Sequence, residues 1–427
     1  MPSSISRFRA GAPAQSDGEG GGGGGAGAGA GGADAGTGTG AACFDARMIP
    51  QHSWGRILLL VFALGCALVS GWEIFWRHHD FIPGDYEDTP AVWALQRQRA
   101  TGTATVLIGS SRMWEDVDLG EWHQTAGVRP VQLAIAGRNP QPVLDELAAD
   151  PAFHGLVVCE VTPYLFYVEP EVHTTAFIHK GRAQTLSQRA ANRLGMMLES
   201  RLAFIDNETR LSTLWKRLPL PLRTGTFPVR EVPKGHEMHA DRDTRMWRRI
   251  ETDADYRALF QRLWLFYAGG PQPTLAQKPA SSATAHPDIV TIVSQASARV
   301  ANNVAKIRAR GGNVVFVRFP SSGPVYWSET RSFPRELSWE PLLRRTGVTG
   351  VNFADYPQLQ GYNLPEWSHM SAADSPRFTR ALATLVMQAA SVNEMPLSPI
   401  VCCIAHPDSK LGTPARCETK DSDLARR

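Results

Sequence analysis

The amino-acid sequence predicts an α/β protein: a flavodoxin-like, doubly wound parallel sheet of about five strands that carries a helical insertion. Short apolar runs bounded by turn residues recur along the chain, as expected of strands buried on both faces of a sheet. Segments of helical periodicity separate these runs. The alternation is interrupted once, so we expect one α/β domain over residues 80–392 with an insertion at residues 165–290.

Five strands are predicted because each run is short and ends at a turn residue or a proline. They are residues 104–108, 130–136, 155–161, 313–319 and 349–353. The first ends at Gly109, the second at Gly137 and the fourth at Pro320.

Helices are predicted between the strands from their periodicity and their end signals. They cover residues 90–99, a segment from 141, residues 289–310 and a segment from about 371. Pro90 follows the capping residues Asp88 and Thr89 in the first helix, and Gly311-Gly312 ends the third.

The insertion at 165–290 holds predicted helices at 183–218 and 253–266, separated by a basic, Pro-rich stretch at 219–249. It forms either a lid or helices that only pack on the sheet. His236 and His239 lie three residues apart, whereas the metalloprotease motif requires four.

Both ends of the 427-residue chain are predicted to be disordered. Residues 1–55 include an almost continuous Gly/Ala stretch at 18–42, and residues 393–427 are rich in Pro, Ser and charge. Neither segment can bury much apolar surface.

The charge balance and the cysteines exclude several classes of protein. The formal net charge is +3, from 44 basic and 41 acidic residues, whereas a nucleic-acid-binding protein is expected to be strongly basic. The six cysteines form no C-x-x-C pair, which argues against a zinc site or a disulfide framework. We expect no metal and no cofactor.

Residues 56–77 are predicted to form a single transmembrane anchor. The run Ile57–Trp72 carries no charge, and with Glu73 the apolar stretch reaches the roughly 20 residues that span a bilayer. Arg47 and Arg56 precede the run and one arginine follows it, which puts the N-terminus inside. The globular part of this single-pass protein is then extracytoplasmic, or periplasmic in a bacterium.

Three other interpretations of the apolar run stay open. It is a buried helix of a globular protein, a signal peptide that is cleaved if translation begins at Met48 rather than Met1, or a lipoprotein signal ending at Cys66. All but the first place the globular part outside the cytoplasm.

The candidate catalytic residues lie after the first strand and before the last helix. Ser111 stands where a strand ends, which is the ligand-binding edge of an open α/β sheet. His369 can take a proton from a serine hydroxyl, and a carboxylate three residues earlier, Glu366, can orient the imidazole. Asp355 is the alternative acid. A helix cap at the serine and a surface loop at the histidine are the structural alternatives.

In this order, the segments resemble the SGNH (GDSL-type) hydrolase superfamily. Gly109-Ser110-Ser111 is similar to the Gly-Asp-Ser turn of the family, Ala134–Gly137 to its second block, and Glu366-x-x-His369 to its final Asp-x-x-His. The resemblance implies a catalytic triad of Ser111, His369 and Glu366, and an oxyanion hole formed by the amides of Ser111 and Gly137.

One family block, Gly-x-Asn-Asp, is absent. Residues 161–164 read Val-Thr-Pro-Tyr at that place. The family asparagine donates to the oxyanion, and its loss could cost about 10²–10³ in rate. Thr162, Arg112 or Asn139 could substitute for it.

The Gly-Ser-Ser-Arg sequence and the anchor are closest in appearance to membrane-anchored SGNH proteins of polysaccharide O-acetylation, such as the alginate acetylation proteins. That resemblance implies a serine esterase or O-acetyltransferase that acts on acetyl esters, with an envelope glycan as substrate and a multi-spanning membrane acyltransferase as partner. A catalytically inactive binding or assembly protein on the same fold is the alternative. A phosphate-binding α/β protein is disfavoured, because no strand is followed by G-x-x-x-x-G-K-[ST] or G-x-G-x-x-G.

Overall fold

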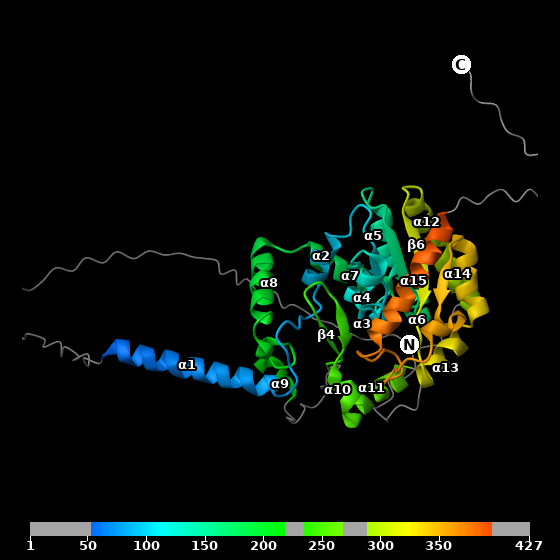
Figure 1. Cartoon of the computed structure of the whole chain (residues 1–427). Helices are drawn as coiled ribbons and strands as arrows, with labels where there is room; N and C mark the ends of the chain where they lie inside the picture. The colour runs from blue at the N-terminus through cyan, green and yellow to red at the C-terminus, as the bar shows by residue number, and fades with distance from the viewer. Residues whose placement is uncertain (1–52, 218–233, 268–287, 395–427) are drawn as a thin grey trace, which may run out of the picture. The chain divides into compact units, whose positions relative to one another are not determined.

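A five-stranded parallel sheet forms the centre of the protein (Figure 1). The computed structural model describes residues 53–217, 234–267 and 288–394. The strands of this sheet are β1 Val106–Ile108, β2 Val131–Gln132, β3 Leu156–Glu160, β6 Asn313–Arg318 and β7 Gly350–Asn352. Their order is β2-β1-β3-β6-β7, and every neighbouring pair is parallel. The order reverses between β1 and β3, and ligands of open α/β sheets bind at the carboxyl ends of strands at such a point.

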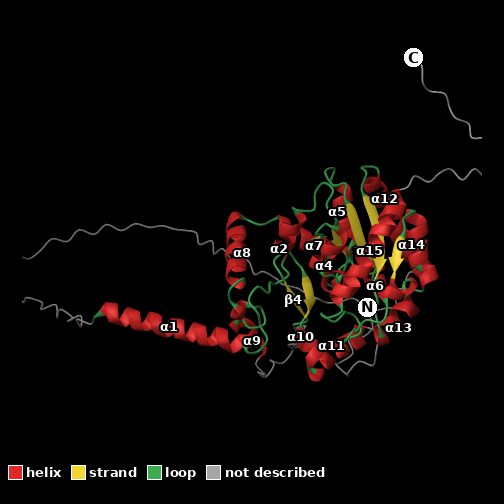
Figure 2. Ribbon diagram, viewed as in Figure 1, coloured by secondary structure: helices red, strands yellow, loops and turns green. Residues whose placement is uncertain are grey.

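Helices cover both faces of the sheet, and Figure 2 shows the strands enclosed by them. On one face, strand residues such as Ile108 and Phe316 pack against residues of six helices. These are α2 Pro90–Arg97, α5 Gln141–Ala149, α6 Pro163–Tyr167, α7 Glu171–Arg182, α12 Ile289–Arg308 and α14 Trp339–Thr346.

On the other face, Leu107, Val158 and Val315 pack against Val92 of α2 and against buried residues of three further helices. These are α3 Ser111–Glu115, α4 Leu119–Ala126 and α15 Ser375–Glu394. Short elements between β6 and α15 complete the domain: α13 Gly323–Ser332 and the 3₁₀ turns η2 Arg335–Leu337, η3 Phe353–Asp355 and η4 Pro357–Leu359.

The connection from β3 to β6 contains further helices and a β-hairpin. After α6 and α7 come α8 Leu186–Glu199, η1 Ala203–Ile205, α9 Leu211–Arg217, β4 His236–Met238, β5 Thr244–Met246, α10 Arg248–Thr252 and α11 Ala254–Tyr267. The sequence predicted helices in both halves of this region but not the hairpin. Most of the Pro-rich stretch that precedes the hairpin, residues 218–233, lies outside the described residues.

The hairpin is held to the sheet by Arg242, whose side chain is fully buried. Its guanidinium donates to the Asp88 carboxylate at 2.8 Å and to the carbonyls of Gln132 and Ala134 at 2.9 and 2.8 Å. These bonds join the loop between β4 and β5 to the end of β2 and to the segment before α2.

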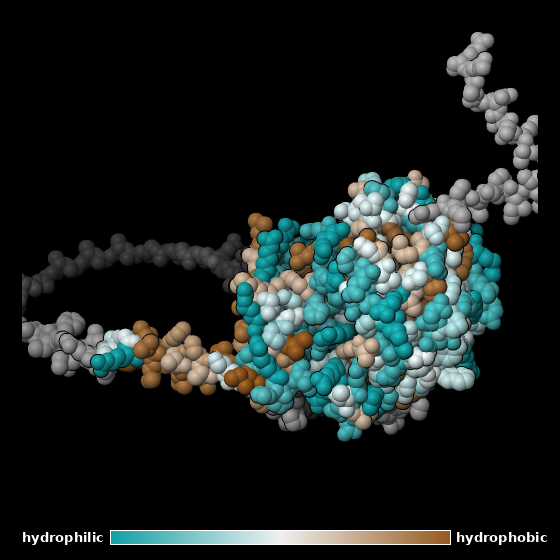
Figure 3. Space-filling view, viewed as in Figure 1, coloured by the Kyte–Doolittle hydropathy of each residue, from teal (hydrophilic) through white to brown (hydrophobic). Residues whose placement is uncertain are grey.

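Helix α1, Trp54–Arg77, has the length and apolarity needed to cross a membrane. It is the single helix of this kind in the described part of the chain. Figure 3 shows hydrophobic side chains along α1 and a mostly hydrophilic to neutral surface on the visible face of the rest. The boundary between two compact units, Met1–Val61 and Phe62–Arg427, falls within this helix.

The α/β class and the five parallel strands predicted from the sequence are confirmed, and helices on both faces are compatible with the predicted doubly wound arrangement. The last helix begins at Ser375 rather than near residue 371, and residues 372–374 before it form a turn. Of the segments predicted to be disordered, residues 1–52 and 395–427 lie outside the described residues.

Candidate active site

The turn after β1 places Ser111 at the carboxyl edge of the sheet, as the first residue of α3. Gly109 makes this turn possible. A Cβ at that position would lie 2.5 Å from Glu160 Oε2 and 2.6 Å from Met113 Cβ, closer than real Cβ atoms approach other atoms. Glycine is therefore required where the chain leaves the strand.

A buried carboxylate at the end of β3 holds the turn in place. Glu160 Oε2 accepts the Ser110 amide at 2.7 Å and the Met113 amide at 3.1 Å. The Ser110 hydroxyl donates to Glu160 at 2.9 Å, and the Thr162 hydroxyl donates to Oε1. Sequence reasoning missed this role of Glu160, although a glutamate inside the apolar run 155–161 was a visible signal.

The structure brings Ser111, His369 and Glu366 into one hydrogen-bonded series. His369 Nε2 lies 2.7 Å from Ser111 Oγ, and His369 Nδ1 lies 2.7 Å from Glu366 Oε1. Because an ionised carboxylate can only accept, the proton of the neutral imidazole sits on Nδ1, and Nε2 can then accept from the serine hydroxyl. This is the geometry that activates a serine for nucleophilic attack.

Glu366 is fixed by its own loop. Its Oε1 also accepts the His369 amide at 2.7 Å, and Oε2 accepts the Ser368 amide at 3.3 Å. The alternative acid, Asp355, forms an exposed ion pair with Arg335 at 2.9 Å. Glu366 is therefore the carboxylate that orients the imidazole.

Two further carboxylates surround His369 on the side of α3, and neither was singled out from the sequence. Glu115 and Asp116 are buried, and Asp116 Oδ1 accepts the Met370 amide at 2.8 Å. Burial alone would lower the pKa of His369, but the charges of Glu115, Glu366 and Asp116 outweigh it and raise that pKa well above the ordinary 6.5. Burial raises the pKa of Glu115 to about 7.

Two backbone amides lie at the edge where an oxyanion would be held. Ser111 follows β1, and Gly137 follows β2 in the left-handed conformation, with φ 64°. The Ile135 amide donates to the Gly109 carbonyl at 3.0 Å, which ties the two turns together. Within residues 53–217, 234–267 and 288–394, neither the Ser111 amide nor the Gly137 amide donates a hydrogen bond.

The three side chains considered as a third oxyanion donor are engaged elsewhere. The Thr162 hydroxyl donates to Glu160, and the Asn139 side-chain amide donates to the Glu169 carbonyl at 3.1 Å. Arg112 is buried and pairs with Glu329 at 2.7 Å. None of these donors points to an oxyanion in this arrangement.

The Arg112 pair belongs to a buried ionic cluster that joins α3 to α13. Glu329 also accepts Arg318 at 2.7 Å and the Ser321 hydroxyl at 3.0 Å. Burial would raise the pKa of Glu329, but the two arginines lower it to about 2. Arg112 Nε also lies 3.4 Å from the hydroxyl oxygen of Ser368, the residue before His369. The cluster therefore contacts both the helix that carries Ser111 and the loop that carries His369.

The insertion contributes residues beside the site. On α11, the Trp264 ring centroid lies 5.5 Å from that of His369, and Gln261 donates to the Pro365 carbonyl at 3.0 Å. On β4, the His236 ring centroid lies 4.4 Å from that of Trp114, a residue of α3, the helix that begins at Ser111. In the part of the chain that the structure describes, no three His, Cys, Asp or Glu side chains are arranged so that they could hold a metal ion.

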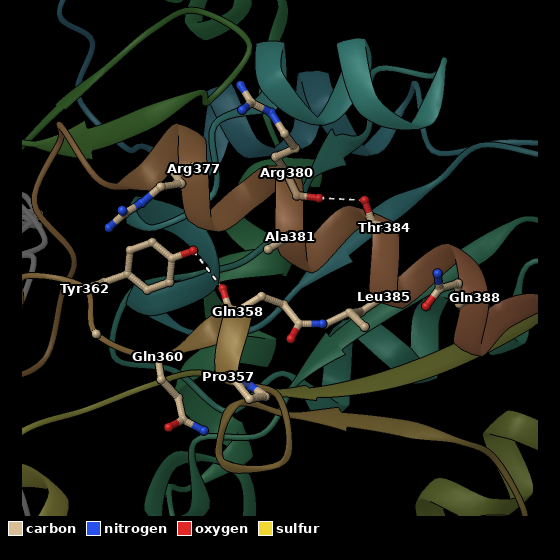
Figure 4. Close-up of a pocket in the computed structure, with 11 residues that line it drawn as sticks. Pro357, Gln358, Gln360, Tyr362, Arg377, Arg380, Ala381, Thr384, Leu385 and Gln388 are labelled. Carbon is tan, nitrogen blue, oxygen red and sulfur yellow. Dashed lines mark hydrogen bonds between the residues drawn. The ribbon is translucent and has the colours of Figure 1, made fainter.

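A shallow surface pocket lies between η4 and α15, with Tyr362 and Arg377 at one end (Figure 4). Its lining contains none of the residues of the Ser111–His369–Glu366 series. The Arg377 guanidinium lies 4.7 Å from the Tyr362 ring, and the pocket is open to solvent. The candidate catalytic side chains therefore lie outside this pocket.

No family model, no curated protein and no solved structure matches the chain. A functional conclusion therefore depends on the geometry of the site itself.

Proposed function

We propose that the protein is a serine esterase or O-acyltransferase of the SGNH type that acts on acetyl esters through an acyl-serine intermediate. The observation that carries the proposal is the pair of 2.7 Å contacts that joins Ser111 Oγ to His369 and His369 to Glu366. A serine–histidine–carboxylate series at the carboxyl edge of a parallel sheet has the parts and the position required for acyl transfer.

The proposed reaction has two halves. His369 Nε2 takes the proton of Ser111 as Oγ attacks the ester carbonyl, while the amides of Ser111 and Gly137 donate to the oxyanion. Collapse of this intermediate breaks the ester bond, and His369 returns the proton to the departing alkoxide. Water or a sugar hydroxyl then loses its proton to His369 and attacks the acyl-serine. The bond between the acyl carbon and Oγ breaks, and His369 returns the proton to Ser111 Oγ.

The SGNH assignment is supported by the order of the blocks along the sheet. The serine turn follows β1, Gly137 follows β2, and Glu366 and His369 precede α15. The departures are local: Ser110 replaces the usual aspartate of the turn, and the chain has no asparagine block after β3.

The substrate and setting follow from the resemblance and from α1. In the proposal, α1 anchors the protein, the domain lies outside the cytoplasm, and the acyl acceptor is an envelope glycan supplied with acetyl groups by a multi-spanning membrane acyltransferase. Trp264, which lies beside His369, would shape the acceptor site.

A fluorophosphonate probe, which modifies activated serines, tests the proposal on the full chain in detergent. We expect labelling to map to Ser111 by peptide mass spectrometry and to disappear in Ser111→Ala and His369→Ala. Ser391→Ala, which removes a hydroxyl on the exposed side of α15, is the matched control and should label normally. Folded protein that shows no labelling at Ser111 would refute an activated nucleophile.

The second candidate is a catalytically inactive binding or assembly protein. It is favoured by one observation: Thr162, Arg112 and Asn139 all have other partners, so none of these three is free to act as a third oxyanion donor. Binding of acetylated oligosaccharides without turnover or probe labelling would select this candidate.

A further inference from the structure

Helix α8 presents an apolar face away from the body of the protein. Its half-buried side is formed by Asn192, Gly195, Met196 and Glu199. The opposite side carries Leu186, Ala190, Leu194, Met197 and Leu198, which are all exposed. Leu186 is 82% and Leu194 is 54% exposed. Apolar residues that share one face of a helix normally pack against the protein core, a partner or a membrane.

The short helix α9, which follows α8 and η1 in the chain, carries a second exposed apolar pair. Leu211 and Trp215 are four residues apart and therefore lie on the same side of the helix, where they are 77% and 65% exposed. We call Leu186, Leu194, Met197, Leu198, Leu211 and Trp215 the outer face. Within the described ranges of the chain, this face has no protein covering it.

The segment between α8 and α9 is fastened to the C-terminal end of α1. Glu73 accepts the amides of Ala203 and Phe204 at 3.0 and 3.1 Å, and Arg77 donates to the Arg201 carbonyl at 3.2 Å. These contacts lie within the second compact unit, Phe62–Arg427. The outer face is therefore next to the point where a membrane-crossing α1 would leave the bilayer.

We propose that the outer face lies on the lipid surface from which α1 emerges. An interfacial helix has an apolar face, a polar opposite face and basic residues beside the apolar one. Arg189 and Arg193 occupy that flanking position on α8, and both are exposed. Trp215 adds a residue type enriched at membrane interfaces. The proposal depends on α1 being the membrane segment and is independent of any catalytic role of Ser111.

Depth-dependent quenching tests this in the full chain, reconstituted in nanodiscs of phosphatidylcholine and phosphatidylglycerol. Leu194→Cys and Leu211→Cys carry an environment-sensitive nitrobenzoxadiazole label. The matched control is Met387→Cys, another exposed apolar residue of a helix. The competing cysteines, Cys43, Cys66, Cys402, Cys403 and Cys417, are replaced by serine, and Cys159 stays because it is buried.

We expect lipids that carry a spin label near the headgroup to quench the labels at positions 194 and 211 several-fold more strongly than the label at 387. Equal quenching at the three positions overturns the proposal. So does a label at 194 that is shielded from aqueous iodide but not quenched by lipid, because a protein surface would then cover the face. Disulfide cross-linking between two chains of the Leu194→Cys variant would also overturn the proposal, because a second copy of the protein would then cover the outer face.

Charge reversal provides an independent measurement. Arg189→Glu with Arg193→Glu should lower the docked fraction in anionic discs by about fivefold per arginine, and should have little effect in discs of phosphatidylcholine alone. Unchanged quenching in anionic discs would overturn the contribution of the two arginines. Phosphonate labelling of Ser111, measured in parallel, keeps the result separate from the proposed catalytic function.

Discussion

The carboxylate beneath the serine turn gives a prediction whose size can be worked out from the structure. Glu160 is 1% exposed and accepts two backbone amides on Oε2, from Ser110 and Met113. Its other oxygen accepts the hydroxyls of Ser110 and Thr162. A backbone N–H has a fixed direction and can only donate, whereas a hydroxyl can rotate and accept a hydrogen bond instead.

Two substitutions of Glu160 should therefore have different costs. In Glu160→Gln, the side-chain oxygen can face the amides while the NH₂ group donates to the hydroxyls, so only the charge assistance is lost, about 1 kcal/mol for each amide bond. The expected loss of stability is about 2 kcal/mol. In Glu160→Ala, two buried amides lose their acceptor at about 1–3 kcal/mol each, and a small cavity remains, for a total of about 5 kcal/mol.

Thermal unfolding of the full chain in detergent measures the difference. At about 2 °C per kcal/mol for a domain of this size, we expect the melting temperature to fall by about 4 °C in the glutamine variant and about 10 °C in the alanine variant. Glu340→Ala is the control, because Glu340 is 45% exposed and its ion pairs are 3.5 Å long. Equal losses in the two variants would refute the distinction between amides and hydroxyls, and an alanine variant as stable as the control would refute the role of the carboxylate.

Three further predictions concern the site. Glu366→Gln should lower the rate of phosphonate labelling of the serine by about 10²-fold or more, because the imidazole loses its charged partner. Asp355→Asn, which removes only a surface ion pair, should label normally. The reverse result would exchange the roles of the two carboxylates. Only the neutral imidazole of His369 can accept a proton, and its pKa is raised, so labelling should increase with pH through a midpoint well above 6.5. Glu115→Gln removes one of the carboxylates that raise this pKa and should move the midpoint to lower pH, and an unmoved midpoint would contradict the assignment. Gly109→Ala should lower the yield of folded protein severely, since its Cβ would lie 2.5 Å from a buried carboxylate oxygen; near-normal yield and melting temperature would show that the turn can shift.

Much of the sheet could be predicted because its strands are buried on both faces and so appear as continuous apolar runs. The run 313–319, for example, is β6 Asn313–Arg318 in the structure. The local pairing of Glu366 with His369 was also accessible, because three residues separate them and the loop folds back. Their catalytic role stays a prediction.

The contacts that sequence reasoning missed join residues far apart in the chain. Arg112 pairs with Glu329 across 217 positions, and Arg242 pairs with Asp88 across 154. The hairpin strands β4 and β5 are three residues each and include charged residues, so no apolar alternation marks them. Their position depends on Arg242, and such long-range partners leave no local pattern.

The end of α1 has a consequence for how the protein can move. Trp76 packs against Phe81, with ring centroids 5.1 Å apart, and Phe81 packs against Trp247 at 5.5 Å. Together with the bonds from Glu73 to the backbone of η1, these contacts make the last turns of α1 part of the folded domain rather than a loose tether. A force or tilt applied to this part of the helix would pass directly into the domain, and removing the helix before Asp80 would leave two η1 amides without their acceptor.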